Sequence, residues 1–274
     1  MRYLEDRPSP KSPQLCVMIF DGRTGSSELV ARLNSHPNVL FYPEILAGPA
    51  NPDHDYSLRW TAIDKTISDV AEMSPVSADL ASYQKTKFDP EDIKICGLKT
   101  RLHGPDDGEF FEREGKAGNF YVVEGDRLLK TLTRHRTLLI RLRRRDIKRT
   151  AISWHRAVEL NNQKNLWNVT QSHTPIGPIT IDPDSFRKTA NWVRSCQLKH
   201  DAAFSAYRGK KISIDYEDML DDWPGVQAAI LEFLGLPQKE LTEFYKKATP
   251  DDLSEAVVNL DEIERVSMKT LFAS

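Results

Sequence analysis

A short loop between an apolar run and a helical pattern is the first place where this chain could do chemistry. The loop, residues 21–27, reads Asp-Gly-Arg-Thr-Gly-Ser-Ser. Gly22 and Gly25 let the backbone turn tightly and approach a ligand closely. The hydroxyl groups that could donate to an oxyanion are those of Thr24, Ser26 and Ser27. Because the helix after a parallel strand points its first N–H groups at the ligand, the loop predicts an anion site.

The loop lacks the lysine of an ATP-binding loop. The motif G-x-x-x-x-G-K-[ST] would place lysine directly after Gly25, where this chain has Ser26. The cation is instead Arg23, whose forked guanidinium can bind a phosphate and a neighbouring anionic group together. The alternative interpretation is an ordinary strand-to-helix turn with a serine N-cap.

A basic run forms the second candidate anion site. Six Lys or Arg residues fall between positions 141 and 149, against the single acid Asp146. If Asp146 caps a helix, Ser153 lies two turns further along nearly the same side. Arg145 by charge and Ser153 by a hydrogen bond could then converge on one anionic group. The alternatives are a solvated basic face and a nucleic-acid patch, and the latter lacks interleaved aromatic residues.

Apolar runs that alternate with amphipathic segments predict an α/β fold in which helices flank a central parallel sheet of about five strands. The predicted strands are 14–20, 38–42, 93–98, 137–142 and 211–215. The predicted helices are 26–35, 57–73, 124–134, 146–161, 184–206 and 223–234. Two polar, weakly patterned stretches, 45–60 and 162–183, interrupt this plan and are assigned to acceptor recognition or to a subunit contact.

Composition excludes several classes of protein. The 274 residues, 39% of them apolar, suffice for one substantial domain, taken as 1–274. A net charge of −2 argues against a nucleic-acid-coating protein. Three cysteines without a CxxC pair suggest neither a disulfide framework nor a zinc site, and they fit a cytoplasmic protein. The apolar run 15–20 is too short for a signal peptide or a membrane span.

Together these motifs resemble the sulfotransferase superfamily, whose donor is 3′-phosphoadenosine 5′-phosphosulfate (PAPS). GRTGSS at 22–27 is similar to its 5′-phosphosulfate loop, and RRRDIKRTAIS at 143–153 to its 3′-phosphate element. The similarity continues in LNSHPNVLFYPEIL at 33–46, GLKT at 97–100, IDYEDMLDDWPGVQAAILEFLGLP at 214–237 and TPDDLSEAVVNLDEI at 249–263. The chain most resembles bacterial carbohydrate O-sulfotransferases, of the type acting on trehalose glycolipids and on nodulation oligosaccharides. The segments 45–92 and 162–183 depart from the family pattern and would contact the acceptor.

The resemblance implies a P-loop-NTPase-like sulfotransferase fold, metal-free transfer, and a role for each matched residue. The 5′-phosphosulfate would be held by Arg23, Thr24, Gly25, Ser26 and Ser27. The 3′-phosphate would be held by Arg145 and Ser153. Glu44, in the family-like FYPEIL, would be the general base that takes a proton from the acceptor hydroxyl, with Arg23 as its partner in catalysis. Lys99 and His103 are weaker candidates for contact with substrate or transition state.

Two of these residues could instead have roles outside catalysis. Glu44 could be a surface charge at a helix start, and Lys99 a strand-end lysine that reaches solvent. The acceptor implied is a hydroxyl of a carbohydrate or glycolipid, and a homodimer is a further expectation.

Two other classes of function remain open from the sequence. A nucleotide-dependent phosphotransferase would require magnesium and a second strand-end aspartate near the loop. A nucleotide-binding scaffold protein would keep the site and lack turnover.

Overall fold

The computed structural model describes residues 13–42, 67–68, 70, 92–102, 125–170 and 172–266. Glu44 and His103 lie outside the described residues, as does most of the helix predicted at 57–73. Of that helix, residues 67, 68 and 70 are described and are helical.

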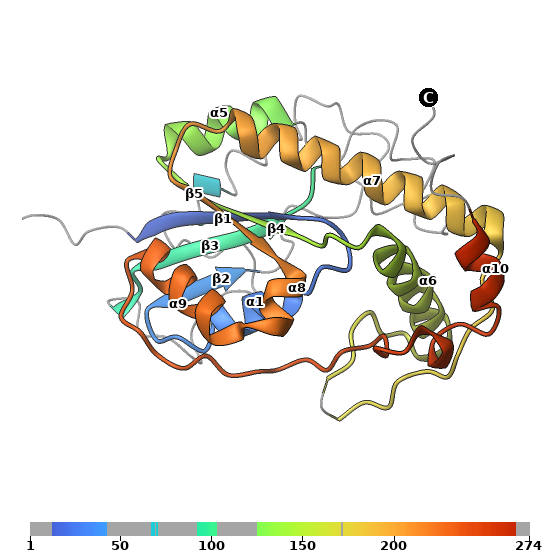
Figure 1. The fold of residues 1–274 in the computed structure, drawn as a ribbon. Helices are drawn as coiled ribbons and strands as arrows, with labels where there is room; N and C mark the ends of the chain where they lie inside the picture. The colour runs from blue at the N-terminus through green and yellow to red at the C-terminus, as the bar shows by residue number, and fades with distance from the viewer. Residues whose placement is uncertain are drawn as a thin grey trace, which may run out of the picture.

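Five parallel strands form one sheet, in the order β2-β3-β1-β4-β5 (Figure 1). They are β1 (Gln14–Phe20), β2 (Val39–Tyr42), β3 (Ile95–Thr100), β4 (Leu138–Arg143) and β5 (Lys211–Asp215). The continuous apolar runs of the sequence suit parallel strands that are covered on both faces. The predicted α/β class with a five-stranded parallel sheet is confirmed, and each strand begins and ends within two residues of its prediction.

Helices cover both faces of this sheet. They are α1 (Ser26–Leu33), α5 (Gly125–Arg134), α6 (Ile147–Lys164), α7 (Pro183–Ala206), α8 (Tyr216–Asp221), α9 (Trp223–Leu234) and α10 (Leu260–Arg265), with a 3₁₀ turn at Leu253–Glu255. Even-numbered residues of β1 share a buried cluster with α1 and α9, and odd-numbered residues share another with α5 and α7. Figure 1 accordingly shows α5 and α7 on one side of the sheet and α1, α8 and α9 on the other. None of the helices among the described residues is long and apolar enough to span a lipid bilayer.

The structure adds two short helices that the sequence did not predict. The first, α8, begins at Tyr216, and its Glu217 accepts hydrogen bonds from the N–H groups of Arg145 and Asp146 at 3.0 and 3.2 Å. These bonds come from a segment about 70 residues away, so local sequence gives no signal of them. The second helix, α10, packs with α6 and α7 in another apolar cluster.

Candidate functional site

The loop after β1 leaves the start of α1 open. Arg23 and Gly25 both have left-handed backbones, with φ of 64° and 75°. Gly25 is the N-cap of α1, and a glycine cap has no side chain that could accept the first N–H groups of the helix. A helix start of this kind favours an anion through both its N–H groups and its dipole.

Both loop glycines are required by close aromatic neighbours. A Cβ added at Gly22 would lie 2.7 Å from the ring of Trp154, and one at Gly25 would lie 2.9 Å from the ring of Tyr216. Thr24 is fully buried, and its hydroxyl donates to the Asp21 carbonyl at 2.8 Å. Thr24 therefore shapes the loop, and its hydroxyl hydrogen is already used within it.

A buried ion cluster fixes the end of β1. The Arg141 guanidinium donates to the carboxylate of Asp21 at 3.2 Å and to that of Asp201 at 3.1 Å. His200 places Nδ1 3.0 Å from the other Asp21 oxygen, while its Nε2 accepts the N–H of Leu102 at 2.9 Å. Arg141 and Asp21 are each 1% exposed, and charges so buried are tolerated because they are paired. The cluster ties the loop to β3, β4 and α7.

Two arginines of the site make hydrogen bonds only to neutral groups among the described residues. Arg23 is half-buried and donates to Ser153 Oγ at 3.4 Å, to the Trp167 carbonyl at 2.9 Å and to Asn168 Oδ1 at 3.4 Å. Arg144 is 5% exposed, donates to the Arg23 carbonyl at 3.2 Å and lies 4.7 Å from the centre of the Tyr216 ring.

Burial of the two guanidinium groups has an electrostatic consequence. Burial, together with the nearby charge of Arg144, lowers the pKa of Arg23 to about 10. Burial also lowers the pKa of Arg144. Two neighbouring positive charges, neither of which forms an ion pair among the described residues, favour a bound anion, because an anion would relieve their mutual repulsion.

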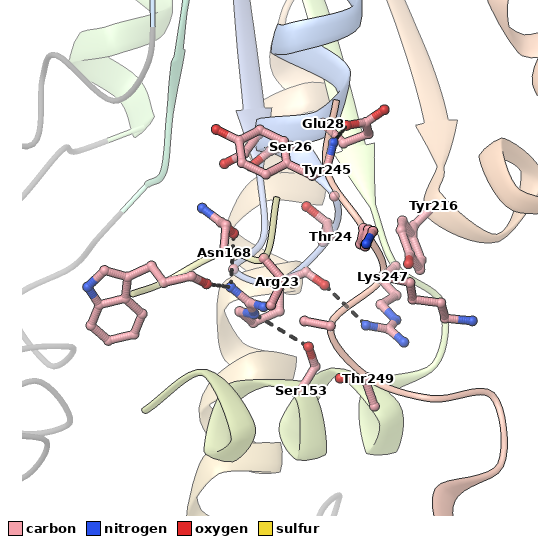
Figure 2. Close-up of a pocket in the computed structure, with 18 of the residues that line it drawn as sticks. Arg23, Thr24, Ser26, Glu28, Ser153, Asn168, Tyr216, Tyr245, Lys247 and Thr249 are labelled. Carbon is pink, nitrogen blue, oxygen red and sulfur yellow. Dashed lines mark hydrogen bonds between the residues drawn. The ribbon is translucent and has the colours of Figure 1, made fainter. Parts of the chain in front are cut away.

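A cavity of about 770 Å³ connects these residues. Its wall includes the loop after β1, Ser153 and Trp154 of α6, the end of α6 and the segment 245–249 (Figure 2). Two buried polar atoms of this wall, Arg144 Nε and Thr249 Oγ1, have no hydrogen-bond partner within the described part of the chain. Such atoms cost free energy unless a ligand or water satisfies them.

Residues 242–249, here called the strap, run past the cavity. Glu28 of α1 accepts the N–H groups of Phe244 and Tyr245, the latter at 2.6 Å. The N–H of Lys246 donates to the Val169 carbonyl at 2.9 Å. Lys247 forms an ion pair with Asp251. The strap is thus bound to α1 on one side and to the segment after α6 on the other.

Lys99 lies beside the loop on β3. It is 4% exposed, and its Nζ donates to the hydroxyl oxygens of Ser26 at 3.2 Å and Ser27 at 2.9 Å. The ammonium lies 5.0 Å from the centre of the Phe20 ring. Lys99 therefore points at the start of α1 rather than reaching solvent.

The structure does not bring Arg145 to the cavity. The Arg145 side chain is half-exposed and binds the carboxylates of Asp215 at 3.3 Å and Asp218 at 2.8 Å. Helix α6 begins as predicted, with Asp146 accepting the N–H of Arg149 at 2.8 Å. Residues that line the cavity and were not assigned from the sequence include Asn168, Tyr216, Thr249 and Arg144. The basic run contains Arg144, but no local pattern distinguishes it from Arg145.

Of the predicted site residues, the structure brings together Arg23, Thr24, Gly25, Ser26, Ser27 and Ser153 around the cavity. A parallel sheet whose central strand leads through a glycine-containing loop into the start of α1 defines an α/β protein of the P-loop-like kind.

Comparison with known proteins gives few matches in sequence. No family model matches the chain. Nodulation protein H of Rhizobium tropici is 23% identical over 231 residues, which cover 82% of this chain and 77% of that protein.

Solved structures described as sulfotransferases also match the chain. The mouse sulfotransferase SULT7A1 complexed with PAP has a TM-score of 0.44 and 12% identity over 95% of this chain and 67% of that one. The sulfotransferase from Alicyclobacillus acidocaldarius has a TM-score of 0.42 and 12% identity over 96% of both chains.

Proposed function

We propose that this protein is a sulfotransferase that moves the sulfuryl group of PAPS to the hydroxyl group of an acceptor. The observation that carries the proposal is the pair Arg23 and Arg144, whose partners among the described residues are all neutral, next to the uncapped start of α1. PAPS carries phosphate at one end and phosphosulfate at the other. A nearly neutral protein needs such local charge to bind it.

The two ends of the donor would be held by different parts of the cavity wall. Arg23 and the first N–H groups of α1 bind the 5′-phosphosulfate, with the Ser26 and Ser27 hydroxyls beside them. Ser153 binds the 3′-phosphate. The buried Arg144 Nε and Thr249 Oγ1 match donors for this phosphate, so Arg144 takes the role that the motif alone assigned to Arg145.

Sulfuryl transfer requires a base for the acceptor and stabilisation of the leaving phosphate. Glu44 takes the proton from the acceptor hydroxyl as its oxygen bonds to sulfur and the bond between sulfur and the phosphate oxygen breaks. Arg23 and the start of α1 stabilise the charge left on that phosphate. Strand β2 ends at Tyr42, two residues before Glu44, on the sheet edge from which the loop also emerges. Lys99, bonded to Ser26 and Ser27, supplies further positive charge at this edge.

A carbohydrate or glycolipid acceptor is part of the proposal. It is supported by two further residues of the cavity wall, Asn165 with its side-chain amide and Trp167 with its indole. Amide groups pair with hydroxyl groups as both donor and acceptor, and an indole offers an apolar face. A single domain, a cytoplasmic location and a homodimer remain predictions of the same proposal.

Heat protection tests the donor assignment. We expect 3′-phosphoadenosine 5′-phosphate (PAP), the product of the donor, to raise the melting temperature without magnesium. Protection by ATP and magnesium but not by PAP would favour a phosphotransferase instead. Transfer of radiolabelled sulfate from PAPS into an extract of the source organism, followed by identification of the product, would define the acceptor.

Replacement of Glu44 tests the base. We expect Glu44→Gln to bind PAP as the wild type does while turnover falls by about 10²-fold or more, the scale for a positioned base. The control for the loss of one negative charge is Asp221→Asn, at the last residue of α8. Normal turnover by Glu44→Gln would exclude Glu44, and His103 would be tested next.

A further inference from the structure

Arg23 differs from three arginines of the basic run in the charge of its partners. Arg141, Arg143 and Arg145 each bind at least one carboxylate, from Asp21, Asp201, Asp215 or Asp218. Arg23, in contrast, is held only by a hydroxyl, a backbone carbonyl and a side-chain amide among the described residues. Its guanidinium is therefore fixed in direction by hydrogen bonds that, among the described residues, involve no carboxylate.

Asn168 supplies the amide of this arrangement, and the chain around it is well anchored. Helix α6 ends where Asn165, with a left-handed backbone, donates its N–H to the Asn161 carbonyl at 2.8 Å. The following segment pairs with the strap through the Thr170 and Tyr245 bridge and through the bond from Lys246 to Val169. Figure 2 shows Arg23 between Asn168 and Ser153, with dashed lines to both.

We propose that Asn168 is a positioning residue, which orients the guanidinium of Arg23 with a neutral oxygen and so keeps its charge available to the anionic donor. The inference rests on the proposed function, in which Arg23 touches the donor. Asn168 acts through Arg23 and need not touch the donor itself.

The neutrality of residue 168 is the testable part of this inference. Aspartate has nearly the same shape as asparagine and would keep an oxygen 3.4 Å from Arg23 Nη1, but it would add a negative charge. The new carboxylate would pair with Arg23 and compete with the donor for its charge. The same pairing would leave the free protein as stable as before, or more stable, because Arg23 would gain a partner.

The experiment compares the affinity of PAP, measured by calorimetry, for the wild type, Asn168→Asp and Asn161→Asp. Asn161 lines the same cavity and is half-buried like Asn168, but it has no bond to Arg23, so it controls for added negative charge. We expect Asn168→Asp to weaken PAP binding about tenfold or more, and Asn161→Asp by no more than about threefold, since a charge that makes no direct pair is screened.

A double-mutant cycle separates positioning from a general structural effect. The forked donor is absent in an Arg23→Lys background. In that background, Asn168→Asp should change the logarithm of the Kd for PAP by no more than about half of the change that it causes in the wild type. Equal effects of Asn168→Asp and Asn161→Asp, or an undiminished effect in the Arg23→Lys background, would overturn the inference. Failure of the wild type to bind PAP would instead overturn the proposed function.

Discussion

Replacement of Arg144 by methionine offers a test that separates binding from folding. Arg144 is 5% exposed, and its partners among the described residues are the Arg23 carbonyl and the Tyr216 ring. Methionine matches the length of the arginine stem and carries no charge. We expect Arg144→Met to lose PAP binding while the free protein keeps its stability or gains some, because burial lowers the pKa of Arg144 and so disfavours its charged form.

The size of the binding loss follows from the proposed contact. A hydrogen bond between a charged donor and phosphate contributes about 1.5 to 3 kcal/mol, which corresponds to roughly a 10- to 150-fold weaker Kd. Calorimetry with PAP measures this change, and thermal unfolding without ligand measures the stability of each variant.

The matched control is Arg145→Met, one residue along the chain. The Arg145 side chain is half-exposed and directed at Asp215 and Asp218 rather than at the cavity. We expect PAP binding by Arg145→Met to change by no more than about twofold, as for an exposed charge screened by salt. Loss of PAP binding in Arg145→Met with normal binding in Arg144→Met would refute Arg144 as the residue that binds the 3′-phosphate. It would support Arg145, the residue that the motif indicated.

Three further predictions concern the loop, a buried histidine and a buried thiol. Gly25→Ala should lower the free energy of unfolding by about 1 to 2 kcal/mol, because Gly25 has a left-handed backbone. The same change should weaken PAP binding, because the new Cβ would displace Tyr216. Unchanged unfolding in urea and unchanged PAP binding by calorimetry would contradict this. Burial lowers the pKa of His36, so the unfolded chain binds more protons as the pH falls below about 6.5, and stability should decrease there. Urea unfolding at pH 7.5 and 5.5 should show this decrease in the wild type and less of it in His36→Gln. Burial raises the pKa of the fully buried Cys16 thiol, so it should resist a thiol reagent at pH 8 until urea unfolds the chain, and rapid labelling of the folded protein would contradict this burial.

Much of the fold could be predicted because its signals are local. Apolar runs bounded by turn residues identified the strands. Asp146 marked the start of α6, and in the structure its carboxylate accepts the N–H of Arg149. Helix α8 was missed because its stabilising bonds join Glu217 to a segment far away in the sequence. The predicted base Glu44 lies outside the described residues and stays a prediction.

The sequence by itself determined that a loop with Arg23 and two glycines follows the first strand and opens a helix, because glycine conformations and strand patterns are properties of a few neighbouring residues. Only the tertiary structure decided which arginine of the basic run faces the cavity. Arg145 binds carboxylates brought by β5 and α8, while Arg144 turns inward against Tyr216. Contacts between segments so far apart depend on how the helices pack on the sheet, and no local pattern encodes them.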